Sequence, residues 1–383
     1  MSWQSCAILA AIAVPFAAGL AGFTPSARAA DMTADQPRIS GPFVHDNLAV
    51  YFLHGPSTVG PVPLTLKEAL TAGRVVVRET GRVNELTIEN TGTEEVFVQA
   101  GDIVKGGQQD RVLTVSFLVP PKSGQMPIGA FCVEQGRWAA RGREDVRQFA
   151  SADKSVPSRE AKLAMLAPAK PRATDPTPGA APSAATSAGL LRSRIDQLHA
   201  TANIDTGSRQ TDVWSSVSSA QSKLSNILGA PVASGQSASS LQLSLENKKL
   251  DETRTAYIDK LKPAGENDAD VIGYVFAVNG RLNSGDVYPS HGLFAKMWGK
   301  LIEASATEAI AEKSAQKSTE KVDIAIPSAD DVRAFLARAE AGNANLSKID
   351  GALTRETRDA DSALFFETRR AAGEFVHRSY LAR

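Results

Sequence analysis

The sequence predicts an α+β fold in which helices pack on a mostly antiparallel sheet. Three observations support this prediction. Short β-type runs crowd the first third of the chain, helical periodicity fills the middle, and β-type runs return at the end. Strands and helices that are segregated in this way favour an α+β fold over a regular parallel α/β fold.

The strands expected in the first third are short apolar runs bounded by Gly, Asn or Pro. They are LAVYFLHG (48–55), RVVVRE (74–79), NELTIEN (84–90), EVFVQA (95–100) and RVLTVSFLV (111–119). A short helix is predicted at TLKEALTAG (65–73). Thr65 can cap this helix, Glu68 can complete a capping box, and Gly73 can close it.

The middle and the end of the chain are expected to alternate between helices and strands. Apolar residues at helical spacing run from Leu190 to Leu228 and stop before Gly229. Further helices are expected at 245–261, at 293–312 and from Ser328, whose hydroxyl can cap the amide of Asp331. The run VIGYVFAV (271–278), the Asn279-Gly280 turn and a return strand at 281–288 predict a hairpin. ALFFETRR (363–370) and EFVHRSYL (374–381) are the last expected strands.

The first 29 residues have the pattern of a signal peptide. An apolar run at 7–23 precedes Ala27-Arg28-Ala29, which predicts cleavage between Ala29 and Ala30. The free amino terminus alone supplies positive charge before this run, since no Lys or Arg precedes it. No other apolar run reaches the ~20 residues of a membrane-spanning helix. We therefore expect a periplasmic or secreted protein without a transmembrane segment after cleavage.

Composition also divides the mature chain into segments. Residues 30–42 are polar and are expected to form a flexible lead-in. The part at 43–150 is rich in predicted strands, and the part at 190–383 is richer in helices. Residues 167–189 contain five prolines and no Leu, Ile, Val or aromatic residue. A segment of this kind buries too little apolar surface to fold, so it is expected to be a disordered linker or insertion.

The charge balance and the motifs exclude several classes of function. Forty-two basic residues balance forty-two acidic ones, which does not favour a nucleic-acid partner. The spacing Gly101-x4-Gly106 lacks the Lys and Ser/Thr of a phosphate loop. The five histidines have no metal-ligand spacing, and no Gly-x-Ser-x-Gly elbow occurs. We therefore expect no metal and no cofactor.

Two polar stretches set among glycines are the candidate ligand-binding segments. Paired Gly106-Gly107 can expose backbone amides that hold an anion between Lys105 and Arg111. The alternative is a strand connection with solvated polar side chains. The candidate residues are Asp102, Lys105, Gly106, Gly107, Gln108, Gln109, Asp110, Arg111, Glu134, Arg137, Trp138 and Asp286.

Several segments also occur in the order typical of one known family. They are VQAGDIVKGGQQDR, PPKSGQMPIGAFCVEQGRW, VIGYVFAVNGRL, LFAKMWGKL and VHRSYL. Together they resemble the ARG-and-Rhodanese-Phosphatase-superfamily-associated protein domain, a bacterial family of uncharacterised function. The resemblance covers 43–150 and 190–381. It implies that both parts form one domain and that the Pro-rich stretch is an insertion, and it transfers no activity or catalytic residue.

Two functions stay open from the sequence. The first is a binding module for a small polar or anionic ligand or for a protein partner. The second is a hydrolase-type enzyme that uses Asp102, Asp110, Glu134 or Cys132. Cys132 is the only cysteine after cleavage, and it lies in the strand-like segment IGAFCVE. A thiol in such a segment is expected to be a packed, unreactive side chain rather than a nucleophile.

Overall fold

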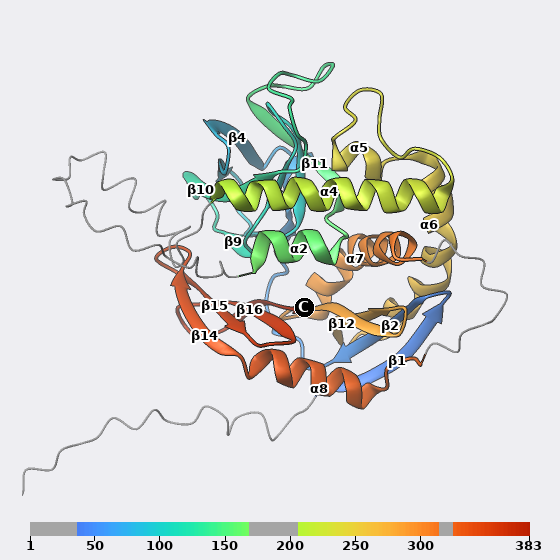
Figure 1. The fold of residues 1–383 in the computed structure, drawn as a ribbon. Coiled ribbons are helices and arrows are strands. Elements are labelled where there is room, and N and C mark those ends of the chain that lie inside the picture. Colours follow the sequence, from blue (N-terminus) through green and yellow to red (C-terminus); the bar gives the residue numbers. More distant parts are fainter. Residues whose placement is uncertain (1–36, 168–205, 314–324) are drawn as a thin grey trace, which may run out of the picture. The chain divides into compact units, whose positions relative to one another are not determined.

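The computed structural model describes residues 37–167, 206–313 and 325–383, and residues 37–383 group into one compact unit. Several predicted segments lie outside the described residues: the predicted signal peptide, the first part of the predicted lead-in, residues 168–189 of the predicted insertion and the helical pattern at 190–198. The α+β prediction is confirmed by the described part, which combines antiparallel sheets with packed helices (Figure 1).

An eight-stranded sheet in which every neighbouring pair is antiparallel forms one layer. Its order begins with the first hairpin and ends with the C-terminal strands. The strands in spatial order are β1 (Arg38–His45), β2 (Leu48–His54), β12 (Val271–Val278), β13 (Arg281–Val287), β17 (Phe375–Ala382), β16 (Ala363–Arg370), β15 (Leu353–Asp359) and β14 (Asn343–Lys348).

A six-stranded barrel lies on the other side of the helices. Its strands, in order around the barrel, are β10 (Gln125–Cys132), β5 (Glu85–Asn90), β4 (Val75–Arg82), β11 (Gln148–Ser155), β7 (Asp102–Gly106) and β8 (Arg111–Leu113). A small sheet of β3 (Leu64–Thr65), β6 (Val96–Val98) and β9 (Phe117–Val119) accompanies it.

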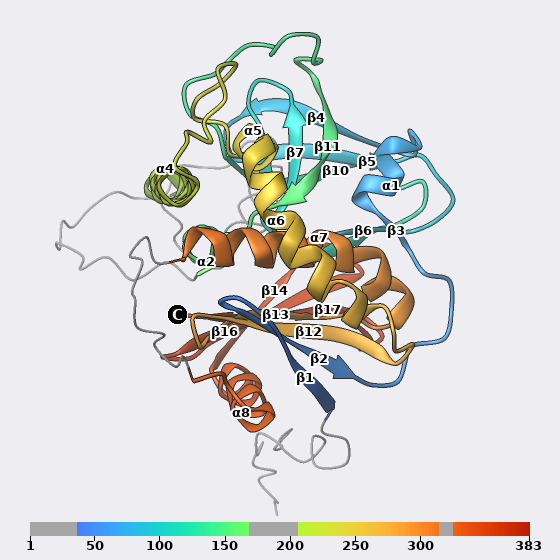
Figure 2. The same ribbon diagram turned by 90° about the vertical axis from the view of Figure 1, so that its right-hand side faces the viewer.

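Helices fill the space between the barrel and the large sheet and cover the far face of the sheet (Figures 1 and 2). Between the layers lie α2 (Arg159–Leu166), α4 (Thr206–Leu228), α6 (Lys248–Leu261) and α7 (His291–Ala311). The short helices α1 (Leu66–Thr71), α5 (Leu241–Leu245) and η2 (Pro263–Gly265) lie at their margins, and α8 (Ala329–Glu340) covers the far face.

Three apolar clusters correspond to these layers. The largest joins barrel residues such as Leu86 to α7 and to the near face of the large sheet, where Phe52 lies. A second cluster packs α8, through Phe335, against the far face of the sheet. A third joins Phe131 of the barrel to α2, α4 and α5. Because α7 is buried by layers on both sides, its side chains meet both the barrel side and the sheet.

The local signals at helix and strand ends are confirmed. Thr65 and Glu68 form a capping box at α1. Ser328 accepts a hydrogen bond from the amide of Asp331 at the start of α8. Asn279 and Gly280 both have positive φ, as the turn between β12 and β13 requires.

Some expectations need correction. Residues 38–42, which we expected in a loose lead-in, belong to β1, which pairs with β2. The run 111–119 is two strands rather than one, since β8 lies in the barrel and β9 in the small sheet. The strands β7, β11, β14 and β15 and the helix α2 were not predicted, and β10 was anticipated only in the strand-like segment IGAFCVE (128–134). Within the described ranges, no helix has the length and apolar character needed to span a bilayer.

Candidate functional site

Two neighbouring cavities lie between the near face of the large sheet and the loops above it. Their volumes are about 30 and 20 Å³, and both are lined by Ala100, Leu166 and Ser379. We call them together the interlayer cleft. Its principal polar lining residues are Gln99, Asp102, Lys162, Tyr274, Ser284, Asp286, Lys300, Arg355, His377 and Ser379.

Strand periodicity explains why polar side chains gather on the floor of the cleft. Ser284 and Asp286 are two residues apart on β13, and His377 and Ser379 are two residues apart on β17. Residues at this spacing share one face of a sheet. The two strands are antiparallel neighbours in a register that places Asp286 opposite Ser379.

Two buried carboxylates line the cleft, each beside a basic side chain. Asp102, the first residue of β7, is 2.8 Å from Lys300 Nζ on α7 and also accepts a hydrogen bond from the amide of Gln99. Asp286 Oδ1 is 3.3 Å from His377 Nε2. All four side chains are mostly or fully buried, so the ion pair with Lys300 stabilises the carboxylate of Asp102.

Several buried groups of the cleft have hydrogen-bonding capacity left over. Ser284 and His377 are 3% and 2% exposed. Among the described atoms, Ser284 Oγ has no hydrogen-bond partner, and His377 Nε2 has none apart from its 3.3 Å contact with Asp286 Oδ1. Buried polar atoms are almost always satisfied by protein or by bound molecules. These two atoms therefore mark the place where a ligand or an ordered water would bind.

Arg355 adds a positive charge to the second cavity. It hydrogen-bonds Thr357 and lies over the ring of Phe366, 5.5 Å from the centroid. No carboxylate forms an ion pair with it in the part of the chain that the structure describes. Burial, and then the nearby charge of Arg209, lower the pKa of Arg355 to about 10.

Two buried phenols complete the surroundings of Asp286. Burial, followed by the charge of Asp286, raises the pKa of Tyr274 and of Tyr288. Both phenols therefore stay protonated at neutral pH. Tyr288 donates to Gln99 Oε1 at 2.7 Å, whereas the Tyr274 hydroxyl accepts a hydrogen bond from Ser305 Oγ at 3.4 Å, and Tyr274 lines the cleft.

Most of the candidate residues from the sequence lie elsewhere, in a buried charge cluster at the barrel. Asp110 is at its centre and is fully buried. Its carboxylate accepts two hydrogen bonds from Arg141, at 2.9 and 3.1 Å, one from Ser240 Oγ at 2.8 Å and one from the amide of Gly106 at 3.1 Å. These donors satisfy the carboxylate, so Asp110 has a structural role.

Glu134 is the second carboxylate of this barrel charge cluster. Arg137 lies 2.8 Å away and the amide of Asp110 donates at 3.1 Å. Burial acts to raise the pKa of Glu134, but these hydrogen bonds, with one from Ser237, outweigh it and lower the pKa. For Arg141, burial acts to lower the pKa, and the bonds to Asp110 and Glu144 outweigh it and raise the pKa. The cluster is therefore held as ion pairs.

The amides that we expected to hold an anion are occupied by carboxylates of the protein itself. The Gly106 amide donates to Asp110, and the Gln108 amide donates to Glu79 Oε1 at 3.0 Å. Gly107 has a φ of +54°, and a Cβ there would lie 2.3 Å from the ring of Phe149. Close packing against Phe149 therefore accounts for a glycine at position 107.

The remaining candidates surround Arg111. Its guanidinium donates to Gln109 Oε1 and lies 2.9 Å from Cys132 Sγ. Trp138 is 52% exposed, and the centroid of its ring lies 5.9 Å from this guanidinium. Its side chain therefore lies at the surface and not in the core. Lys105 binds Glu246 on the surface.

Of the twelve candidates, the structure brings only Asp102 and Asp286 to the interlayer cleft. Sequence reasoning did not identify their neighbours Lys300, His377 and Ser284. A usable signal was present, since Ser284 and Asp286, like His377 and Ser379, are two residues apart in segments expected to be strands and therefore share a face. Separately, His54, Asp268 and Asp270 bring three potential metal-ligand atoms within 4.8 Å of one another.

The fold and the cleft together define a class of protein: an antiparallel barrel set on a large antiparallel sheet, with buried polar side chains between them. Comparison with protein families assigns the chain more closely. Residues 36–381 match the ARG and Rhodanese-Phosphatase-superfamily-associated Protein domain, and the chain belongs to this family. No curated protein and no solved structure matches it.

Proposed function

We propose that this protein is a binding module that takes a small anionic ligand into the interlayer cleft. The observation that carries the proposal is the buried Ser284 Oγ, which has no hydrogen-bond partner among the described atoms, beside His377 Nε2, whose one contact is with Asp286 Oδ1 at 3.3 Å. Pockets with a few convergent polar groups on a rigid scaffold are the usual sites for small ligands.

The charges of the cleft favour an anion over a cation. Lys162, Lys300 and Arg355 face two carboxylates, Asp102 and Asp286, which leaves one positive charge in excess without counting His377. Lys300 pairs with Asp102, and His377 lies against Asp286. Arg355 is the cation best placed for a ligand, because its half-buried guanidinium has no carboxylate partner in the described part of the chain and can bind an anion through two hydrogen bonds.

The volume limits the size of what enters. A water molecule needs about 10–15 Å³ of cavity space, so cavities of about 30 and 20 Å³ hold a small group. A carboxylate or phosphate group with few attached atoms is the ligand class that fits this space. Because the polar groups are buried, this arrangement favours a small ligand over a protein partner.

The alternative function, a hydrolase that uses the candidate carboxylates or Cys132, receives little support. Asp102, Asp110 and Glu134 each form close ion pairs with a cation. Burial raises the pKa of Cys132 to about 11, which disfavours the thiolate that a nucleophile needs.

Thermal unfolding in the presence of inorganic phosphate or acetate tests the binding proposal. A ligand that binds only the folded state raises the midpoint as its concentration increases. We expect this rise in the unmodified protein and its loss in Arg355→Gln. Arg333→Gln is the matched control, since Arg333 pairs with Asp330 on α8, on the opposite face of the sheet. An equal rise in Arg355→Gln, or no rise in the unmodified protein with either anion, would overturn the proposal.

We also propose that the protein is exported to the periplasm or secreted. The apolar run at 7–23 and the Ala27-Arg28-Ala29 triplet support this. The intact mass of protein recovered outside the cytoplasm should correspond to a chain that begins at Ala30. Recovery of the full-length chain in the membrane fraction would contradict the proposal.

A further inference from the structure

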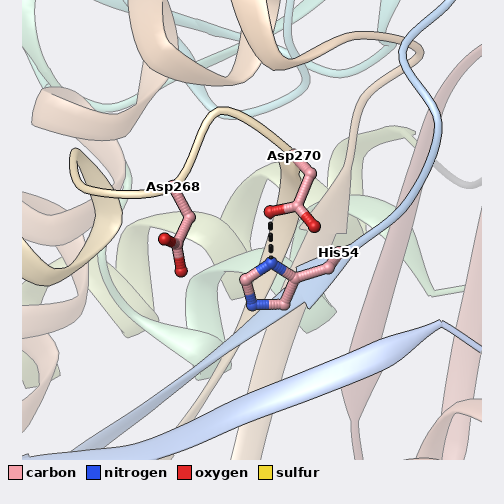
Figure 3. A group of neighbouring side chains, drawn as sticks. All are labelled: His54, Asp268 and Asp270. Atoms are coloured by element: carbon pink, nitrogen blue, oxygen red, sulfur yellow. Dashed lines mark hydrogen bonds and ion pairs between the residues drawn. The ribbon is translucent and has the colours of Figure 1, made fainter.

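A histidine outside the interlayer cleft is bonded through both of its ring nitrogens. His54, the last residue of β2, lies with Nδ1 2.7 Å from Asp270 Oδ1 and with Nε2 2.7 Å from Ser40 Oγ. Its side chain is 2% exposed, whereas that of Asp270 is 53% exposed. Figure 3 shows the carboxylate of Asp270 directed at one nitrogen of the ring, with the other nitrogen on the side away from it.

Sheet register brings the three residues together. In the pairing of β1 with β2, Arg38 lies opposite His54 and Ser40 lies opposite Phe52. On the other side, Val271 of β12 lies opposite His54, and Asp270 directly precedes it. The register of β1 shifts between Ser40 and Phe43.

Glycine is required at this shift. Gly41 has a φ of +105°, and a Cβ there would lie 2.7 Å from the carbonyl oxygen of Val50. Ser40 directly precedes this shift in β1, the edge strand of the sheet, and its side chain is half-buried.

Three groups lie against the two ring nitrogens. The bonds from His54 and Arg38 lower the pKa of Asp270 to about 2, so its carboxylate is ionised and only accepts. Arg38 pairs with this carboxylate at 3.0 Å, and its Nη2 also lies 2.7 Å from His54 Nδ1. In the tautomer with the proton on Nδ1, that nitrogen donates to Asp270 Oδ1, and Nε2 accepts the hydrogen bond from the Ser40 hydroxyl.

We propose that Ser40, His54 and Asp270 form a nucleophilic serine site that hydrolyses small carboxylic esters. A serine hydroxyl whose oxygen is bonded to a histidine, itself oriented by a carboxylate, is the arrangement that activates serine for acyl transfer on unrelated folds. Such an arrangement is recognised by the geometry of its three side chains and not by a sequence motif. The site is separate from the interlayer cleft, so the two proposals stand independently.

The reaction needs no co-reactant except water. Ser40 Oγ attacks the ester carbonyl carbon and its proton passes to His54 Nε2, giving a tetrahedral intermediate. The bond to the alcohol oxygen then breaks, and His54 returns the proton to the leaving alcohol. Water, deprotonated by His54, attacks the acyl-serine and releases the carboxylic acid and Ser40. Asp270 keeps the imidazole in the required tautomer and stabilises its cationic form.

A metal centre is the competing interpretation of the same residues. His54, Asp268 and Asp270 offer suitable ligand atoms, and Figure 3 shows Asp268 beside the pair. The guanidinium of Arg38, 3.0 Å from Asp270, would face the bound dication. Nη2 of this guanidinium also lies 2.7 Å from His54 Nδ1, the ring nitrogen on the side of Asp270, so it occupies the place of an ion there. The geometry therefore favours the serine site.

A fluorophosphonate probe, which reacts with activated serines, tests the proposal on the mature chain. We expect covalent labelling of Ser40, located by peptide mass spectrometry, and a burst of nitrophenol from p-nitrophenyl acetate. Ser40→Ala should abolish both signals, and Asp270→Asn should lower the labelling rate at least tenfold. Because Asp270 is exposed, its substitution should leave the fold intact even if a variant of the buried His54 does not fold. Ser57→Ala is the control, since Ser57 only accepts a bond from the amide of His291.

Three outcomes would overturn the proposal. Labelling that survives Ser40→Ala would place the reactive group elsewhere. Absence of labelling in a folded protein whose melting temperature falls on Ser40→Ala would make the three residues a structural clamp for β1. Absence of labelling combined with Zn²⁺ binding that Asp268→Asn abolishes would establish the metal interpretation instead.

Discussion

Nη1 of Arg111 lies 2.9 Å from Sγ of Cys132, and neither side chain is accessible to solvent. The two residues are paired neighbours on β8 and β10 of the barrel. A cation so close acts to lower the pKa of a thiol. Burial is the larger effect here and raises the pKa of Cys132 to about 11. The expectation of a buried cysteine is confirmed, although its neighbour is more polar than the sequence indicated.

Cys132 should therefore resist thiol reagents in the native protein. At pH 8 we expect labelling by a maleimide to be at least a hundredfold slower in the folded protein than in denaturant, because both access and thiolate formation are suppressed. Quenched samples analysed by mass spectrometry give the two rates. Fast native labelling would revive Cys132 as a nucleophile.

The same pKa shift predicts a loss of stability in alkali. Between about pH 9, where the unfolded thiol titrates, and pH 11, the folded state keeps a proton that the unfolded state releases. The free energy of unfolding should therefore fall as the pH rises through this window. In Cys132→Ala this part of the decline should disappear, which urea titrations at several pH values would measure.

Asp110→Asn should strongly destabilise the protein, because it removes the buried carboxylate that accepts two hydrogen bonds from Arg141 and leaves this guanidinium only Glu144 and Glu134 as charged partners. Breaking a buried ion pair by removing one member costs about 3–5 kcal/mol. The control is Glu252→Gln, which removes an exposed partner of Lys248 and should cost less than about 1 kcal/mol. Chemical denaturation measures both. Similar costs for the two variants would show that the barrel charge cluster is not structural.

Glu134 should contribute to acid denaturation. Its pKa is lower in the folded state than the ordinary value of 4.5, so its stabilising contribution is present above that pH and is lost as the pH falls below it. In Glu134→Gln, the free energy of unfolding should vary less steeply between about pH 5 and pH 3. An unchanged slope would indicate that other carboxylates govern the acid transition.

Gly107→Ala should be costly for two reasons. The positive φ disfavours any side chain, and the new methyl group would meet the ring of Phe149. Strain and overpacking of this kind cost about 1–3 kcal/mol each. Gly235→Ala, where a Cβ meets nothing within 4 Å, should be nearly neutral. Partial recovery of stability in Gly107→Ala combined with Phe149→Ala would confirm the packing role.

The sequence predicted those elements of the fold in which buried positions carry apolar residues and exposed positions carry polar ones. The strand at 271–278 is apolar throughout because both of its faces are covered, and every residue in it is buried. The strand β14, with the sequence NANLSK, has mostly exposed residues and lies at an edge of the sheet. Edge strands carry polar residues that avoid association, so the apolar pattern used to find strands is absent there.

The site was only partly predictable because its residues come from distant segments. Asp102 and Lys300 meet only when α7 packs below β7, and no local pattern encodes that contact. The run 111–119 shows the same limit. It looks like one strand, yet the chain changes sheets at 114–116, where Thr114 and Ser116 line the interlayer cleft. Local hydrophobicity does not distinguish a continuous strand from one that switches partners.

The order of strands in the large sheet has a consequence for how the protein acquires its structure. His54 of β2 pairs beside Val271 of β12, and the whole barrel is built from the chain between them. Pairing between strands so far apart in the sequence is slow, because the chain loses conformational entropy when the long loop closes, before the contacts between the strands stabilise it. Pulse-labelling hydrogen exchange should find amides of β4 and β5 protected before those of β2. During synthesis the barrel can therefore form early, whereas β2 can pair with β12 only after residues 271–278 have been made.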